Sequence, residues 1–356
     1  ITMEPGLSGA GGSGESGLVA SAAHPGRVAG CALPAVSAGN YLAPNVPVLI
    51  LSDDAGLTWR AHMVAGAGRT NSCSVVADTQ QPDTFVINVT NQPRIGNVPP
   101  VAFATMNGGL TWQKLSYGSS TDVYVIGLSN GVALAYIASS KLPAAPAPQG
   151  LAEAMLTATG AGSWHMVYTN IPGLNDPTNS FETVAMDPSI PSHLYVAMST
   201  GAFGVTVYAT SDAGATWHSV LRVSTAINVL LWTANNRKVF MEVYRGQDAP
   251  YQLYYSANDA ATWSGIATHY RDGGEEIHSS PSGRLVSVTV QSVIAPLSPT
   301  DSGTDVENFF TLDPTTGAYT LIGTYPFPSG TQLGVVVDGP TPTLIYGGYL
   351  RLLPPQ

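Results

Sequence analysis

The stretch SDDAGLTW at residues 52–59 decides the fold, because the chain repeats it. TMNGGLTW at 105–112 and TSDAGATW at 210–217 keep the same order of hydroxyl, acid or amide, glycine, threonine and tryptophan. Three further copies are less regular, namely SANDAATW at 256–263, TATGAGSW at 157–164 and TLDPTTGAY at 311–319. The closing aromatic residues are separated by 53, 52, 53, 46 and 56 residues. A unit of about 52 residues is therefore repeated along the chain.

Each copy has the composition of a tight turn between two β-strands. An acid or amide at the third position can accept hydrogen bonds from backbone N–H groups across the turn, and glycine supplies a backbone with positive φ. Apolar runs such as 48–51 and 101–104 precede the copies and are typical of strands. We interpret the third-position residues and the tryptophans, which would pack between sheets, as structural: Asp54, Asn107, Asp212, Asn258, Trp59, Trp112, Trp164, Trp217 and Trp263.

The pattern resembles the Asp-box, or BNR, repeat Ser/Thr-x-Asp-x-Gly-x-Thr-Trp. This repeat occurs in bacterial sialidases, other glycoside hydrolases, sortilin-type receptors and photosystem II assembly factors. The resemblance implies an all-β fold, a β-propeller of four-stranded antiparallel blades, in which each box joins the third strand to the fourth. It covers nearly the whole chain, so residues 1–356 are expected to form a single domain. The motif is specific for the fold and not for a function.

The repeat length sets the number of blades. Six blades of about 52 residues would run from about residue 16 to about residue 325. Three apolar runs remain beyond them, at 333–337, 343–346 and 350–353. Residues 1–15 can supply a fourth strand or form a flexible arm, as GGSG at 11–14 suggests. We therefore predict a seventh blade closed by both termini, since a ring without open strand edges resists aggregation. Six blades with a C-terminal flap is the alternative.

Composition excludes several classes of partner. Only 10% of the residues are charged and the net charge is −10, which argues against nucleic acid and against an anionic membrane surface. No apolar run reaches 18 residues, so no transmembrane segment is predicted. The motifs of phosphate-binding loops and of zinc-binding Cys pairs do not occur, and the acidic residues match no calcium loop. We expect neither a cofactor nor a bound metal.

The two cysteines and the N-terminus bear on localisation. Cys31 and Cys73 could form one disulfide in an oxidising compartment, or remain as two reduced thiols of the core. The chain begins without the pattern of a signal peptide, as both a processed secreted protein and a cytosolic one would. Asn88-Val89-Thr90 is a glycosylation sequon, a triplet that is common by chance. We expect an extracellular protein, either secreted or part of a cell-surface ectodomain.

The loops opposite the boxes hold the candidate functional residues. Segment 269–278 combines two His, a Tyr, an Arg and three carboxylates, which can supply an acid, a base and a charge clamp. A solvated turn is the competing interpretation of the same segment. The candidate catalytic residues are Tyr270, Asp272, Glu275 and Glu276. The candidate substrate-binding residues are Arg69, Arg94, Arg222, Arg245, Arg271 and His278.

A sialidase-like enzyme would need an arginine triad, because guanidinium groups bind a carboxylate bidentately. Arg222, Arg245 and Arg271 are candidates for the triad. The resemblance also implies an aromatic-Arg-Ile-Pro element before the first box, and only Arg27 lies in that stretch. We therefore favour a module that binds a glycan or protein ligand on its loop face, with a sialidase-like glycoside hydrolase as the alternative. An assembly factor acting through a basic patch fits least, since basic residues are few.

Overall fold

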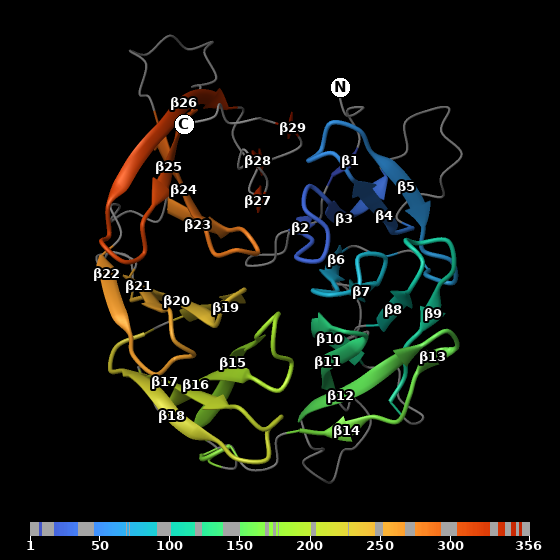
Figure 1. Ribbon diagram of the computed structural model, residues 1–356, viewed down its shortest axis with the longest axis horizontal. Coiled ribbons are helices and arrows are strands. Elements are labelled where there is room, and N and C mark those ends of the chain that lie inside the picture. Colours follow the sequence, from blue (N-terminus) through green and yellow to red (C-terminus); the bar gives the residue numbers. More distant parts are fainter. Residues whose placement is uncertain are drawn as a thin grey trace.

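The computed structural model describes residues 7–8, 18–34, 46–68, 70, 72–90, 101–117, 123–137, 150–167, 171–173, 176, 178–200, 204–226, 228–245, 252–267, 275–292, 305–327, 334–338, 343–346 and 349–350. Every regular element in these ranges is a β-strand. The strands form antiparallel sheets that succeed one another around a ring, in the order of the sequence (Figure 1). Within the described ranges, nothing has the length and apolar character of a membrane-spanning helix.

Six sheets have four or more strands, and we number them as blades 1 to 6. Blade 1 contains β1 (Leu7–Ser8), β2 (Leu18–Ala20), β3 (Val28–Pro34), β4 (Val48–Ser52) and β5 (Arg60–Met63). Blade 2 contains β6 (Ser72–Ala77), β7 (Phe85–Thr90), β8 (Val101–Thr105) and β9 (Gln113–Lys114). Blade 3 contains β10 (Val123–Ser129), β11 (Val132–Ile137), β12 (Gly150–Thr157), β13 (Gly160–Ala161) and β14 (His165–Met166).

The second half of the ring follows the same plan. Blade 4 contains β15 (Asn179–Met186), β16 (Leu194–Thr200), β17 (Val205–Thr210) and β18 (His218–Val223). Blade 5 contains β19 (Asn228–Ala234), β20 (Lys238–Tyr244), β21 (Gln252–Ser256) and β22 (Ser264–Ala267). Blade 6 contains β23 (Glu275–Ser279), β24 (Leu285–Ser292), β25 (Asp305–Leu312) and β26 (Tyr319–Phe327). These four-stranded antiparallel blades confirm the predicted propeller architecture.

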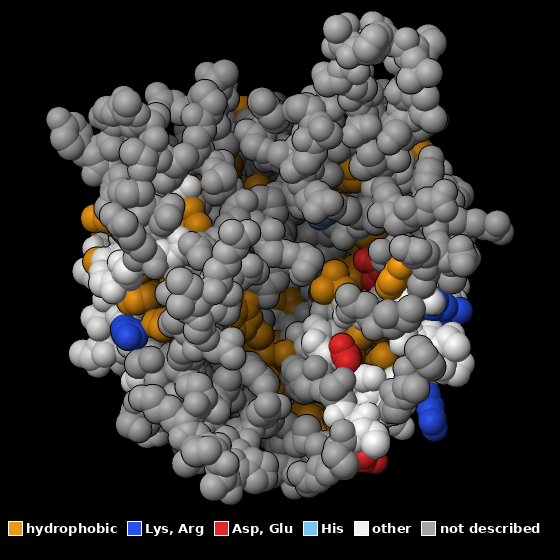
Figure 2. All heavy atoms as spheres, turned by 180° about the vertical axis from the view of Figure 1, so that it is seen from behind, with side chains coloured by type: hydrophobic (Ala, Val, Ile, Leu, Met, Phe, Trp, Pro, Cys, Tyr) orange, Lys and Arg blue, Asp and Glu red, His pale blue; other side chains and the backbone are white. Residues whose placement is uncertain are grey.

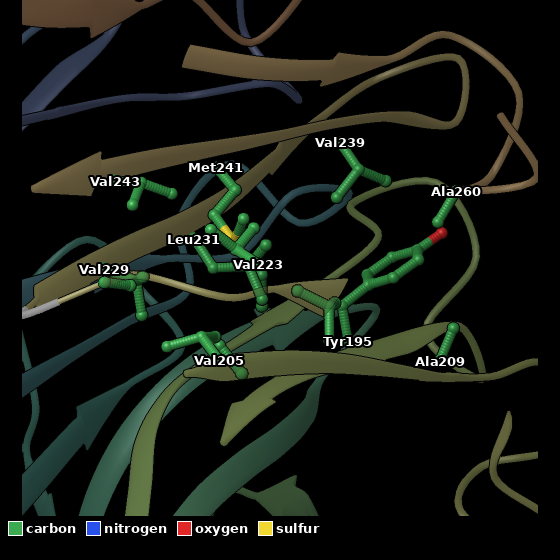
Figure 3. Packing of buried hydrophobic residues seen from close by; sticks show 14 residues of the cluster. Tyr195, Val205, Ala209, Val223, Val229, Leu231, Val239, Met241, Val243 and Ala260 are labelled. Carbon is green, nitrogen blue, oxygen red and sulfur yellow. The ribbon is translucent and has the colours of Figure 1, made fainter. Parts of the chain in front are cut away.

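The core is divided among the seams between neighbouring sheets. At the seam of blades 4 and 5, Tyr195 and Val205 of one blade share a buried cluster with Leu231 and Met241 of the next (Figure 3). Other clusters join the remaining neighbours around the ring. Both faces of a blade are covered in this way, and β4, with the sequence VLILS, is therefore buried along its whole length. The charge-poor composition follows from this burial.

The C-terminal strands form a smaller sheet that closes the ring. β27 (Gly334–Val337), β28 (Thr343–Tyr346) and β29 (Tyr349–Leu350) pair in this order. Val336 packs against blade 6, and Val335 and Val337 pack against blade 1. The described chain thus has six blades of four or five strands, with a three-stranded sheet between the last and the first.

The predicted complete seventh blade, with a strand from residues 1–15, is not confirmed. β1 pairs with Leu33 and Pro34 of β3, so its two residues extend blade 1 instead of the C-terminal sheet. The physical reason is the length of β3, whose first three residues alone pair with β2. Its remaining inner edge would otherwise leave backbone N–H and C=O groups unpaired, and β1 satisfies them. The six-bladed alternative describes these blades better.

Candidate functional site

The repeated turns are held together by their own side chains. In the turn between β4 and β5, Ser52 Oγ accepts a hydrogen bond from Gly56 N at 2.7 Å and donates one to Asp54 Oδ1 at 2.8 Å. Asp54 in turn accepts from Thr58, through the backbone N at 2.8 Å and the hydroxyl at 2.6 Å. Ala55 and Gly56 have φ of 55° and 85°, the left-handed region that favours glycine. Each polar residue of the motif therefore has a partner inside the turn.

Three other turns repeat this geometry with either an acid or an amide. The third-position oxygen accepts the backbone N–H of the following threonine in each of them, from Thr111 to Asn107, from Thr216 to Asp212 and from Thr262 to Asn258. Hydrogen bonds from Thr210 and Thr216 lower the pKa of Asp212 to about 2. The pKa of Asp54 is also lowered, because the bonds from Thr58 and Ser52 outweigh the opposing effect of burial. Both carboxyl groups are ionised acceptors at neutral pH and are unsuited to donate a proton.

The tryptophans of the motif lie at the seams. Trp59 Nε1 donates to Gly56 O at 2.9 Å, and Trp164 Nε1 donates to Ser116 O at 2.8 Å. Trp112, Trp217 and Trp263 pack as partly buried residues against the clusters between neighbouring blades. Each turn is thereby anchored to a seam. Trp232, outside the motif, stacks on Phe240 with ring centroids 5.5 Å apart.

A second turn motif, which the sequence analysis missed, closes the innermost strand of several blades. Ser21, Asp78, Asp187 and Ser280 each directly follow an innermost strand and accept a backbone N–H from the turn that comes next. Their recurrence at about the blade length is the signal that could have found them. These turns lie on the same side of the ring as the repeated turns, because both connect strands that run in the same sense. Gly26 O, for example, accepts from Ala55 N at 2.7 Å.

Arg27 belongs to this side of the ring and joins blade 1 to blade 2. Its Nε donates to Asp53 Oδ1 at 2.6 Å, and Nη1 donates to Asp83 Oδ1 at 2.7 Å and to Pro82 O at 2.6 Å. The guanidinium is nearly buried, with a side-chain exposure of 9%. Arg27, the single arginine before the first repeated turn, is therefore engaged in the contact between blades 1 and 2.

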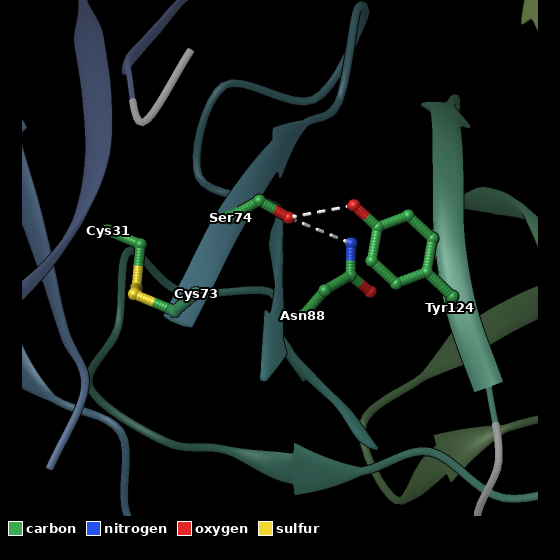
Figure 4. The surroundings of a disulfide bond; sticks show 5 residues. All are labelled: Cys31, Cys73, Ser74, Asn88 and Tyr124. Atoms are coloured by element: carbon green, nitrogen blue, oxygen red, sulfur yellow. Dashed lines mark hydrogen bonds between the residues drawn. A yellow bond between two sulfur atoms is a disulfide. The ribbon is translucent and has the colours of Figure 1, made fainter. Parts of the chain in front are cut away.

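The disulfide and the sequon residue also join neighbouring blades (Figure 4). Cys31 of β3 is bonded to Cys73 of β6, which links blade 1 to blade 2. The Asn88 side chain donates to Val125 O at 2.7 Å and accepts from Val125 N at 2.8 Å, which links blade 2 to blade 3. Asn88 is 1% exposed, so its amide nitrogen is closed to a glycosylating enzyme in the folded chain.

The predicted loop-face residues are only partly within the described ranges. Glu275, Glu276 and His278 belong to the innermost strand β23, in register with Thr289, Val288 and Val286. This corrects the view of 269–278 as one loop, because strand pairing begins at Glu275. Outside the described residues lie Arg69, Arg94, Tyr270, Arg271 and Asp272.

Two of the three arginines predicted for the triad, Arg222 and Arg245, lie within the described ranges, so their positions in the ring can be compared. Arg222 is exposed on β18, the outermost strand of blade 4, in register with Thr206. Arg245 directly follows β20, the second strand of blade 5, at the end of the blade opposite the repeated turn. They therefore stand on different blades and at different distances from the ring axis. Arg271, the third predicted arginine of the triad, lies outside the described residues.

Arg245 takes part in a polar chain with two residues of β21. Its Nη2 donates to the Tyr254 hydroxyl at 3.0 Å, and this hydroxyl donates to Gln252 Oε1 at 2.9 Å. Arg245 Nε is buried without a hydrogen-bond partner among the described residues. A guanidinium, a phenol and an amide side by side can bind hydroxyl-rich or carboxylate ligands. We call Gln252, Tyr254 and Arg245 the Arg245 cluster.

Within the described ranges, no group of three or more His, Cys, Asp or Glu is placed to hold a metal ion. Figure 2 shows one face of the molecule, on which the described charged side chains are few and scattered.

The order of the strands in the sheets defines a β-propeller. The chain is similar to a GH74 enzyme of Niastella koreensis, with 14% identity and a TM-score of 0.37 over 93% of this chain and 62% of that one. It is also similar to the endosialidase of phage phi92, with 9% identity and a TM-score of 0.48 over 96% and 63%. A six-bladed fucose-recognising lectin of Aleuria aurantia matches with 10% identity and a TM-score of 0.46 over 89% and 98%.

The chain thus spans less than two thirds of the length of the first two of these proteins. Identities this low concern the fold alone. No protein-family model matches the chain, and no curated protein matches it.

Proposed function

We propose that this chain is an Asp-box β-propeller that is secreted or displayed on the cell surface and binds a glycan or protein partner on the loop face. The repeated turns support this proposal, since their acids and amides are engaged as acceptors within the turns. Arg27, in the turn between β2 and β3, is likewise engaged in a seam. Binding chemistry is therefore expected at the opposite end of the blades.

The Arg245 cluster is the observation that carries the proposal. It joins a cation, an aromatic ring and an amide at the loop-face end of blade 5, and it is held in place by two hydrogen bonds. Half-buried groups of this kind orient a ligand at little entropic cost, because their rotamers are fixed before binding. Guanidinium and phenol groups are also frequent in the energetically dominant parts of interfaces.

The disulfide supports the proposed localisation. Bonds such as Cys31–Cys73 persist in oxidising compartments and are rare in the cytosol. A secreted or ectodomain propeller would keep this link between blades 1 and 2. Alkylation of the native protein before and after reduction tests it, with two additional labelled thiols expected after reduction only.

The test of binding combines a glycan array with pull-down from an extracellular protein fraction, using the wild type, Arg245→Ala and Arg222→Ala. We expect Arg245→Ala to weaken binding at least about tenfold, the typical effect of losing an interfacial arginine. Arg222→Ala is the matched control, an exposed arginine on an outermost strand, and is expected to bind normally. Equal effects of both changes, or no effect of either, would exclude the Arg245 cluster as the binding site.

The same proteins should be assayed on a panel of aryl glycosides, sialosides included, from pH 4 to 8. The proposal expects no turnover. Turnover that Arg245→Ala and Glu275→Ala both abolish would replace the binding module by a glycoside hydrolase acting on the same face.

A further inference from the structure

The seam between blades 4 and 5 carries a cluster of ionisable side chains that neither the turns nor the Arg245 cluster uses. Asp259 stands at the fourth position of the repeated turn in blade 5, where the other turns have Ala55, Gly108 and Ala213. Its backbone has φ of 63°, close to their values of 55°, 67° and 54°. The turn therefore keeps its conformation, and the added carboxylate is free to reach blade 4.

Two residues of blade 4 bind the Asp259 carboxylate. His193 Nδ1 lies 2.9 Å from Oδ1 and 2.8 Å from Oδ2, and the Tyr195 hydroxyl donates to Oδ1. Tyr195 is 1% exposed, and its ring crosses the seam towards Ala260 (Figure 3). Burial acts to raise the pKa of Asp259, but the hydrogen bonds from Tyr195 and His193 outweigh it and hold this pKa below its ordinary value.

A second carboxylate lies next to this pair. Asp187 follows β15, is fully buried, and its backbone N–H donates to His193 O at 2.9 Å. Its Oδ1 accepts from Ser189 N and Ile190 N, whereas Oδ2 is buried without a hydrogen-bond partner among the described residues. Burial chiefly, with a contribution from the charge of Asp259, raises the pKa of Asp187 above its ordinary value.

We propose that these residues form a latch between blades 4 and 5 that is tightened when Asp187 takes up one proton while Asp259 stays ionised. Neutral Asp187 removes a buried negative charge next to Asp259, and the bonds from His193 and Tyr195 to Asp259 persist. Arg237, in the turn between β19 and β20, is the other charged side chain that acts on Asp259 within the described ranges. It favours the ionised form.

The two carboxyl groups change the stability of the seam in opposite directions. The pKa of Asp187 is higher in the folded than in the unfolded chain, so its protonation stabilises the fold, and this contribution fades as the pH rises through the folded value. The pKa of Asp259 is lower in the folded chain, so its contribution is present above the ordinary value of 3.8 and is lost as the pH falls through the folded value. The latch is therefore tightest in mildly acidic solution.

Hydrogen exchange of the backbone amides in β16 and β21 tests the latch between pH 4.5 and 7.5, after correction for intrinsic exchange rates. The equilibrium constant for opening the seam should fall as the pH is lowered, by at most about tenfold per pH unit for one proton. Asp187→Asn has nearly the same shape without the charge and should reduce this slope. Combined with His193→Gln, which removes the imidazole partner of Asp259, it should abolish the slope, whereas His193→Gln alone should keep the part due to Asp187. Asp78→Asn is the matched control in blade 2 and should leave the slope at β16 and β21 unchanged.

A slope in Asp187→Asn equal to that of the wild type, or no slope in the wild type, would overturn the proposal. Carbon NMR titration of the aspartate carboxyl groups gives a second measurement on the wild type itself. One group should titrate above the ordinary range, and its midpoint should fall in Asp259→Asn, because the neighbouring charge is removed. If every aspartate carboxyl group titrates at or below 3.8, no proton is available to tighten the latch.

Discussion

Asp78 and Asp187 occupy the same place in blades 2 and 4, yet among the described residues only Asp78 finds partners for both of its oxygens. Asp78 Oδ1 accepts from the backbone N–H groups of Gln80 and Gln81 in its own turn and from Asn130 in blade 3. Its Oδ2 accepts from Gly131 N at 2.6 Å. Asp187 makes the two bonds within its own turn, and its Oδ2 has no partner among the described residues.

The comparison shows that the first carboxylate oxygen finds its partners within its own turn, whereas a partner for the second oxygen depends on the neighbouring blade. The acid after an innermost strand caps its own turn in both blades. The second oxygen depends on the next blade, where Asn130 and Gly131 have φ of 50° and 75° and present two successive N–H groups to Asp78. Such pairs of N–H groups bind anions well. In blade 5 the equivalent turn uses Asn235 N to bind Pro281 O of blade 6 instead.

The largest expected effect comes from removing the satisfied acid. Asp78→Ala leaves four N–H groups without their acceptor, two of them at a seam, and should cost about 3–5 kcal/mol of the free energy of unfolding. Urea denaturation of the wild type and of the variant measures this cost. Asp187→Asn, at the equivalent place, should cost little or stabilise at neutral pH. Similar losses of unfolding free energy from both changes would show that the two seams depend equally on this aspartate.

A covalent link offers the next comparison, between the seam of blades 1 and 2 and the seams without a disulfide. The bond joins residues 42 positions apart. Replacing both Cys31 and Cys73 by Ala should lower the free energy of unfolding by about 2–4 kcal/mol, because the unfolded chain regains the entropy of the open loop. The wild type under reducing conditions should approach the variant, and the variant should not respond to the reductant. Unchanged stability in the variant would show that Arg27 and the apolar cluster hold this seam alone.

Much of the fold could be predicted from the sequence because the repeated turn is a local device. The contacts of Asp54 and Asp212 lie within the turn, so the spacing of the motif shows where the outer strands meet. The closure of the ring could not be derived this way. It depends on which strand edge residues 7–8 pair with, and the short pairing of β2 with β3 decides this. Sequence spacing alone contains no such information.

The candidate site was less predictable because seams and loop clusters bring distant residues together. Tyr254 and Arg245 form a cluster across two strands, whereas the sequence analysis named only the arginine. Asp259 was not among the predicted site residues, yet it binds His193 of another blade. Charge-rich segments attract functional interpretation, but Glu275 and Glu276 begin a paired strand. Sequence patterns report local geometry well and contacts between blades poorly.

The smallest expected effect comes from exchanging acid and amide between two repeated turns. Asp212 accepts the Thr216 hydroxyl. Asn258 also accepts the hydroxyl of its threonine, Thr262, and in addition donates its amide N–H to it, while the bond from the backbone N–H is kept in both turns. Asp212→Asn should therefore leave the thermal midpoint nearly unchanged at pH 7.

The turns that contain Asp212 and Asn258 should contribute differently to thermal stability in acidic solution. The pKa of Asp212 is lowered to about 2, so the stability it contributes is present above its ordinary value of 3.8 and is lost as the pH falls through about 2. Thermal midpoints from pH 2 to 7 should fall less steeply below pH 4 in Asp212→Asn than in the wild type. Asn258→Asp should fall more steeply, since it adds a further such acid to Asp54 and Asp212. Parallel curves for all three proteins would mean that the backbone N–H bond alone, without the charge, sets the stability of the turn.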